Sequence, residues 1–190
     1  MATDSLELQR YSRTAIWLHW IIAALLIINL FLGFFHEDFE KPVRSVMMSV
    51  HKATGLTVLW LTLVRIAWRL RHRPPALDSA LKPWEAGLAR AVHALFYLAL
   101  LAIPLSGWLL TSSGNRWTSY FGLFQVPPLP IPRSKDAREL FEEMHQLLGY
   151  AMLLLVVLHV GGALKHHLQG HRHLIGRMAP WRRGSADAGY

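Results

Sequence analysis

The chain has 190 residues, of which 53% are hydrophobic and 17% charged, and its formal net charge is +8. Apolar content this high and this clustered excludes a disordered chain and argues against a nucleic-acid-binding domain. The lack of cysteine excludes disulfides, thiolate zinc sites, iron–sulfur clusters and haem attached through cysteines, so any metal or cofactor chemistry has to use the 11 histidines.

The first apolar segment, from Ile16 to Phe35, carries no charged residue and has two tryptophans near its start, where aromatic side chains mark the membrane interface. At 1.5 Å per residue its length of ~30 Å matches the hydrocarbon thickness of a bilayer. The second segment runs from about Val46 to Trp68. It is uncharged between Lys52 and Arg65, whose long side chains can reach toward the interface.

The third segment runs from Ala91 to about Leu110, and Pro104 and Gly107 predict a kink in it. The fourth runs without a charge from Met144 to Leu164. Its helix is expected to continue into the polar residues before it, which places the span at about 141–165. Four spans, at 16–35, 46–68, 91–110 and 141–165, predict an all-α integral membrane four-helix bundle in the lipid bilayer, with residues 1–190 forming a single membrane domain.

The connections at 36–45, 71–83 and 112–135 read as loops, and residues 181–190 read as a disordered tail. If the N-terminus is inside, the cytoplasmic segments hold twice as many lysines and arginines as the outer loops. The positive-inside rule therefore predicts that both termini are cytoplasmic. The first and third spans then run outward, and the second and fourth run inward.

Ionisable side chains inside a bilayer are costly, which makes the intramembrane histidines candidates for function. His51 and His145 begin spans that run inward, so both are expected near the outer face. His19 begins a span that runs outward. His159 follows His145 by 14 residues, about 21 Å deeper and on nearly the same helix face. The four histidines are thus expected in two layers, His51 with His145 and His19 with His159.

Two imidazoles from two helices at one depth form the axial ligand set of a b-type haem, and bis-histidine ligation of two haems uses all four histidines. The residue four positions after each histidine is small, which leaves room for a flat macrocycle; these residues are Ala23, Gly55, Gly149 and Ala163. A tetrahedral zinc site is disfavoured because the two pairs lie at different depths. A membrane scaffold whose histidines only pack is the other alternative. His93, with Tyr97 at the same offset, is interpreted as a packing or hydrogen-bonding residue.

Several short motifs share the order and spacing found in one family. They are Arg10-Tyr11-Ser12-Arg13, Trp17-Leu18-His19-Trp20, His51-Lys52-Ala53-Thr54-Gly55, Val64-Arg65 with Arg69, His93, Ile103-Pro104-Leu105-Ser106-Gly107-Trp108, His145-Gln146-Leu147-Leu148-Gly149-Tyr150, and Leu158-His159 with Lys165-His166-His167. From Tyr11 to Pro180 the chain resembles the bacterial cytochrome b561 family of four-helix dihaem membrane proteins, and in particular its superoxide oxidases. In quinol–cytochrome c oxidoreductases two helices each carry a histidine pair, whereas here only one helix does.

The resemblance implies a multi-pass protein of the bacterial inner membrane with two non-covalent haem b groups. It also implies an oxidoreductase that oxidises superoxide to oxygen and reduces ubiquinone or a related quinone. Bis-histidine haem has no open site for oxygen, so it suits electron transfer. The alternative is a cytochrome b subunit that passes electrons between the quinone pool and a partner redox protein, docked on the proline-rich loop at 112–135.

Three groups of charged or titratable residues are candidates for roles at the two membrane faces. At the inner face, residues that would anchor a quinone or exchange protons with it are Arg71, His72, Arg73, Lys82, His166 and His167. At the outer face, cations that would attract superoxide are Arg44, Lys52, Arg116, Arg133, Lys135 and Arg138, opposed by Glu37, Asp38, Glu40, Glu139, Glu142 and Glu143. Candidates for haem propionates are Arg10, Arg13 and Lys52, whose alternative role is that of ordinary flanking charges at the interface.

Overall fold

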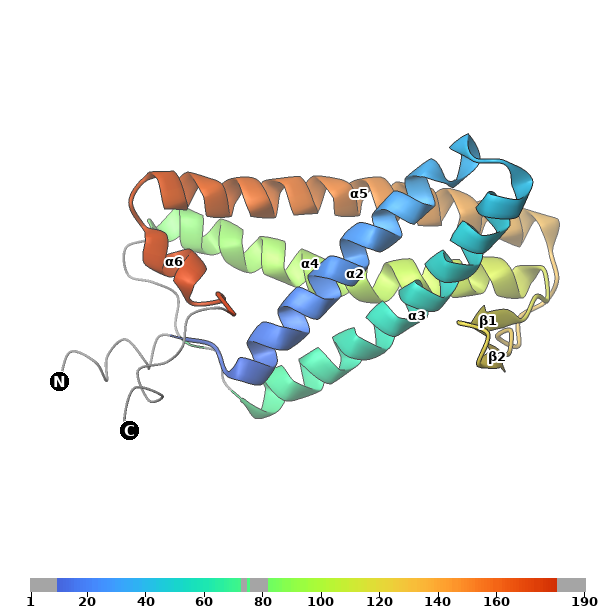
Figure 1. Ribbon diagram of the computed structural model, residues 1–190, viewed down its shortest axis with the longest axis horizontal. Helices are drawn as coiled ribbons and strands as arrows, with labels where there is room; N and C mark the ends of the chain where they lie inside the picture. The colour runs from blue at the N-terminus through green and yellow to red at the C-terminus, as the bar shows by residue number, and fades with distance from the viewer. Residues whose placement is uncertain (1–9, 73–74, 76–81, 181–190) are drawn as a thin grey trace.

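Four long helices make up most of the chain in the computed structural model, which describes residues 10–72, 75 and 82–180 (Figure 1). The elements in chain order are α2 (Arg13–Phe35), η1 (His36–Asp38), α3 (Lys41–Arg71), α4 (Pro83–Ser113), β1 (Thr118–Tyr120), β2 (Phe124–Val126), α5 (Lys135–Leu168) and α6 (Arg172–Gly176). Helices α2, α3, α4 and α5 are each long and apolar enough to cross a membrane. The predicted all-α membrane bundle is therefore confirmed. The predicted disordered tail at 181–190, and Arg73 of the inner loop, lie outside the described residues.

The helices extend beyond the segments predicted to span the bilayer. Helix α5 has 34 residues, which at 1.5 Å per residue is about 51 Å and exceeds the ~30 Å hydrocarbon core. Its start is capped by Ser134, whose Oγ accepts a hydrogen bond from the Ala137 N–H at 3.3 Å, and Ser12 caps α2 through the Ala15 N–H in the same way. Polar first and last turns can thus project from the membrane without ending the helix.

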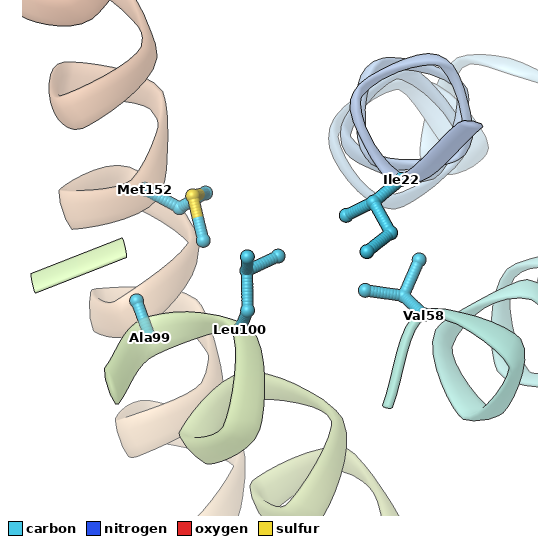
Figure 2. Close-up of a cluster of buried hydrophobic side chains, with 5 residues drawn as sticks. All are labelled: Ile22, Val58, Ala99, Leu100 and Met152. Carbon is cyan, nitrogen blue, oxygen red and sulfur yellow. The ribbon is translucent and has the colours of Figure 1, made fainter. Parts of the chain in front are cut away.

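The bundle keeps its helices in sequential contact, with α2 along α3, α3 along α4, and α4 along α5. Its core lies at mid-length, where Ile22 and Val58 face Ala99, Leu100 and Met152 (Figure 2). Large apolar side chains cover the outside. Examples more than half exposed are Ile27, Leu98, Leu147 and Val157. An apolar exterior of this kind is suited to lipid rather than to water.

The loop predicted at 112–135 contains a β-hairpin that the sequence analysis missed. Strands β1 and β2 pair antiparallel, and the Leu123 N–H donates to the Tyr120 carbonyl at 3.0 Å to close the turn. Phe121 and Gly122 have φ of 51° and 78°, and this left-handed pair is typical of tight hairpin turns. The Tyr120 hydroxyl lies 3.0 Å from Thr57 Oγ1 and ties the hairpin to α3. This end of the bundle is called the hairpin end below, and the opposite end the α6 end.

Candidate functional site

Four histidine rings meet in two pairs at opposite ends of the bundle. At the hairpin end, the ring centres of His51 on α3 and His145 on α5 are 6.0 Å apart, with the planes at 87°. At the α6 end, those of His19 on α2 and His159 on α5 are 6.2 Å apart, at 68°. Met152 lies seven residues from each α5 histidine and is fully buried. Helix α5 therefore holds one member of each pair, with the bundle core between them.

Each pair has the separation that two axial ligands of one iron require. Two metal–nitrogen bonds of about 2 Å, together with about 1 Å from each nitrogen to its ring centre, put the ring centres about 6 Å apart. The two observed separations agree with this sum. Among the described residues, no group of three or more histidine, aspartate or glutamate side chains converges as a metal site made of protein ligands alone would require. The pairs thus fit haem b, whose macrocycle supplies the other four nitrogens.

The rings at the hairpin end are held by backbone carbonyls of the neighbouring helix. His51 Nδ1 lies 3.1 Å from the Asn29 carbonyl on α2, and His145 Nδ1 lies 3.1 Å from the Ile103 carbonyl on α4. A carbonyl only accepts, so each Nδ1 carries the proton and donates it. Each Nε2 then keeps its lone pair for a metal, which is the usual arrangement of a ligating histidine.

Two glycines allow this contact, and the sequence analysis did not assign either of them to the site. A Cβ on Gly33 would lie 3.0 Å from His51 Cε1, and one on Gly107 would lie 3.0 Å from His145 Cε1. Each follows its carbonyl residue by four positions and so lies one turn along the same helix face. The sequence signal for this contact was a glycine inside a membrane helix. Glycine there lets a group from a neighbouring helix, such as a histidine ring, approach the backbone closely. Gly107 was instead interpreted as part of a kink.

Of the four small residues predicted to leave room for the haems, the two glycines do not face an imidazole as Gly33 and Gly107 do. A Cβ on Gly55 would lie 3.5 Å from Asn29 Nδ2, and one on Gly149 would lie 3.9 Å from Phe34 Cζ. Both distances are ordinary van der Waals contacts, and Ala23 and Ala163 are half-buried. Room for a macrocycle at these positions stays a prediction. The closest approaches of an imidazole to a helix backbone are at Gly33 and Gly107 instead.

The rings at the α6 end have mainly aromatic neighbours. Trp20 lies at 5.4 Å from His19, and Phe96 at 5.3 Å from His159, centre to centre. Within the part of the chain that the structure describes, neither His19 nor His159 takes part in a hydrogen bond. His93, predicted to pack or hydrogen-bond, brings its ring centre to 5.8 Å from His159 and makes this layer a cluster of three imidazoles.

A cationic pocket opens beside the His19–His159 pair. Its lining includes Arg10, Arg65, Arg69 and Tyr97. Arg65 Nε donates to the Tyr97 hydroxyl at 3.2 Å, and the Arg69 guanidinium lies 5.5 Å from the centre of the same ring. None of the described residues that line the pocket is acidic. Of the predicted propionate partners, Arg10 lines the pocket and Arg13 is not among its lining residues. Arg65 and Arg69 line it as well, although neither was predicted to contact a propionate.

The predicted superoxide-attracting cations at the hairpin end divide into two groups. Arg116 and Arg138 each act electrostatically on Lys52, which in turn acts on the adjacent His51. The others are dispersed: Arg44 donates to the Glu37 carbonyl at 2.8 Å, and Lys135 lies 3.6 Å from Glu139. The three clustered cations, called the outer cation cluster below, thus form one local positive patch.

The candidates for quinone contact lie around the start of α4 and the end of α5. Glu85 joins the two helices, because its carboxylate accepts from Lys165 Nζ at 2.9 Å and from the Lys82 backbone N–H at 3.1 Å. Among the described residues, the buried Nδ1 atoms of His166 and His167 find no hydrogen-bond partner. His72 is stacked on Trp68 with ring centres 3.9 Å apart, and it lines the cationic pocket. Glu85 was not among the residues predicted from the sequence, yet it organises this region.

Comparison with known proteins identifies the family. A family model described as prokaryotic cytochrome b561 matches residues 10–181. The chain belongs to the prokaryotic cytochrome b561 family. The resemblance inferred from the sequence motifs is thereby confirmed. Membership makes the chain a multi-pass bacterial membrane protein of electron transfer, and a cytochrome b implies haem b as its cofactor.

Three relatives show the range of the likeness. Cytochrome b561 homolog 1 of Escherichia coli (strain K12) is 29% identical over 179 residues, which cover 93% of this chain and all of the relative. Probable superoxide oxidase CybB of Yersinia pestis is 28% identical over 177 residues, covering 93% of this chain and 99% of the relative. Cytochrome b562 of Cereibacter sphaeroides is 28% identical over 177 residues, covering 88% of this chain and 94% of the relative.

Proposed function

We propose that the chain holds two b haems, one between His51 and His145 and the other between His19 and His159, and carries electrons from superoxide to ubiquinone. The observation that carries the proposal is the pair of ring contacts at 6.0 and 6.2 Å at the two ends of α5. Haem b, when bound, takes up and releases one electron at a time. The hairpin end faces outward and the α6 end faces the cytoplasm of a bacterial inner membrane, as the distribution of lysine and arginine favours.

The proposed reaction joins a one-electron donor, superoxide, to a two-electron acceptor, ubiquinone. Two superoxide anions each lose one electron and give two molecules of oxygen. One ubiquinone takes up the two electrons with two protons and gives ubiquinol. His51 with His145, and His19 with His159, would hold the two haems, and a haem held by two histidines has no open site, so superoxide would give up its electron at an exposed haem edge.

The outer cation cluster supports superoxide as the electron donor. Lys52, Arg116 and Arg138 gather a positive potential next to the His51–His145 pair, and such a potential concentrates a small anion and raises its encounter rate. The name of the Yersinia pestis relative agrees with this donor. The cluster also suits the propionates of the haem at this end.

The rate with superoxide is expected to depend on salt and on the outer cation cluster. With purified holoprotein, a superoxide-generating system and a soluble ubiquinone, quinol formation should fall several-fold from low to high ionic strength, because screening shortens the reach of surface charge. Replacing Arg116 and Arg138 with Gln should lower the low-salt rate and flatten its salt dependence. The control is Lys41→Gln, an exposed cation outside the cluster. A rate independent of salt in the unaltered protein would count against steering, and no quinol formation would refute the proposed reaction.

The α6 end is the proposed quinone site. Replacing Lys82, His166 and His167 together with Ala should slow quinone reduction about tenfold or more, because proton delivery and anchoring are lost. Haem content and the reduction of the haems by superoxide should not change. Arg90→Ala, which removes an exposed cation from the same end of α4, serves as the control. Loss of haem from the triple variant would show instead that these residues support the haem layer.

A second function is favoured by the surface of the hairpin. Trp117, Leu123 and Phe124 are 60%, 78% and 56% exposed at the end where the electron would enter. An exposed apolar patch of this kind can dock a partner redox protein, and the chain would then be an electron-transfer subunit. Quinol formation by the purified chain with superoxide alone favours the first function. If no quinol forms with superoxide and a partner protein reduces the chain instead, the electron-transfer subunit is favoured.

A further inference from the structure

The two histidine pairs differ in how their rings are held. At the hairpin end both Nδ1 atoms donate a hydrogen bond to a backbone carbonyl of another helix. The ring on α3 donates to α2, and the ring on α5 donates to α4. At the α6 end, among the described residues, His19 and His159 make no hydrogen bond. We call each combination of ring, carbonyl and facing glycine a carbonyl clamp. One comprises His51, Asn29 and Gly33, and the other comprises His145, Ile103 and Gly107.

We propose that the two carbonyl clamps make the His51–His145 layer the low-potential end of the electron path, so that electrons run from the hairpin end to the α6 end. A hydrogen bond from Nδ1 to a carbonyl makes the imidazole a stronger electron donor at Nε2. A more basic axial ligand favours the oxidised iron and lowers its reduction potential. Both axial ligands of one layer carry such a bond, so the two effects act on the same iron.

Nearby charges do not cancel this difference. Arg65 lies close enough to act electrostatically on His19, His93 and His159, and a cation there favours an added electron. Lys52 acts on His51 in the same sense at the other end. Each layer therefore has cations beside it, the outer cation cluster at the hairpin end and Arg65 with Arg69 at the α6 end. Among the described residues, hydrogen bonds of the ligand rings occur in one layer and not in the other.

Ser106 strengthens one of the two clamps. Its Oγ donates to the Ile103 carbonyl at 2.8 Å and lies 2.9 Å from His145 Nδ1. Because its hydrogen is used by the carbonyl, its oxygen is an additional acceptor for the imidazole N–H. Ser106 is 3% exposed, so water does not compete for this bond. A side chain, and not only the backbone, is thus available as a positioning residue.

The order of the potentials presupposes the two proposed haems, and a potentiometric titration of the holoprotein tests it. Gly33→Ala and Gly107→Ala each place a methyl group 3.0 Å from a ring carbon and push that ring off its carbonyl. Each variant should shift the lower of the two midpoint potentials to a more positive value and leave the higher one in place. Ser106→Ala removes an acceptor without adding an atom and should produce a smaller shift of the same sign. Gly161→Ala is the matched control, since nothing lies within 4 Å of its Cβ position.

The outcomes separate this inference from the function on which it rests. Fewer than two haems in the unaltered protein would refute the proposed function itself. Two haems with the higher potential shifted in the glycine variants, or with both potentials unchanged in all three variants, would overturn only the order of potentials. If either glycine variant loses a haem, the remaining midpoint should be the higher one. A remaining lower midpoint would contradict the proposal.

Discussion

Replacing any one of His19, His51, His145 or His159 with Ala is expected to remove one of two haems and to leave the other. In the proposed arrangement each ring pair would hold one haem iron, and the two pairs lie toward opposite ends of α5. Haem per chain, measured on the detergent-purified protein by a pyridine haemochrome assay and a reduced-minus-oxidised spectrum, should fall from two to one. His51→Ala and His145→Ala should give the same residual spectrum, and His19→Ala and His159→Ala should give the other one.

His93→Ala is the discriminating control for this series. His93 brings its ring as close to His159 as His19 does, at 5.8 Å against 6.2 Å. If His19 is the ligand, His93→Ala keeps two haems. If His93→Ala loses one haem while His19→Ala keeps both, the assignment of the α6-end pair is wrong. One haem or none in the unaltered protein would contradict the two-layer arrangement as a whole.

Breaking the α6-end pair is expected to separate electron entry from electron exit. In His19→Ala, superoxide should still reduce the haem at the hairpin end, because that layer and the outer cation cluster are intact. Quinone reduction should fall to background, because the layer nearest the quinone site is lost. Stopped-flow absorbance at the haem α-band follows the first step, and quinol formation follows the second.

His51→Ala provides the reciprocal experiment. Reduction by superoxide should be lost, while added quinol should still reduce the remaining haem at the α6 end. Gly161→Ala should behave like the unaltered protein in both assays. If superoxide reduces the remaining haem in His51→Ala but not in His19→Ala, the two substrates react at the ends opposite to those proposed.

Much of the fold could be predicted from the sequence because a membrane-spanning helix is recognised from the length and hydropathy of one continuous segment. Apolar runs long enough to span a bilayer located α2, α3, α4 and α5, since hydropathy and a rise of 1.5 Å per residue need no tertiary information. The helix ends did not follow, because a polar helix can continue beyond the hydrocarbon core. The hairpin was missed because its strands have only three residues each, which is too short for a periodic pattern.

The sequence by itself determined that the chain is a membrane helical bundle and which histidines share a depth. Both properties depend only on composition and on spacing along a helix. Only the tertiary structure decided how the rings are held. The Asn29 carbonyl meets His51, Gly107 meets His145, and Arg65 meets Tyr97, through contacts between different helices. The rotation of one helix against another sets such contacts, and a single sequence carries no direct record of it, so the carbonyl clamps and the cationic pocket became visible only in three dimensions.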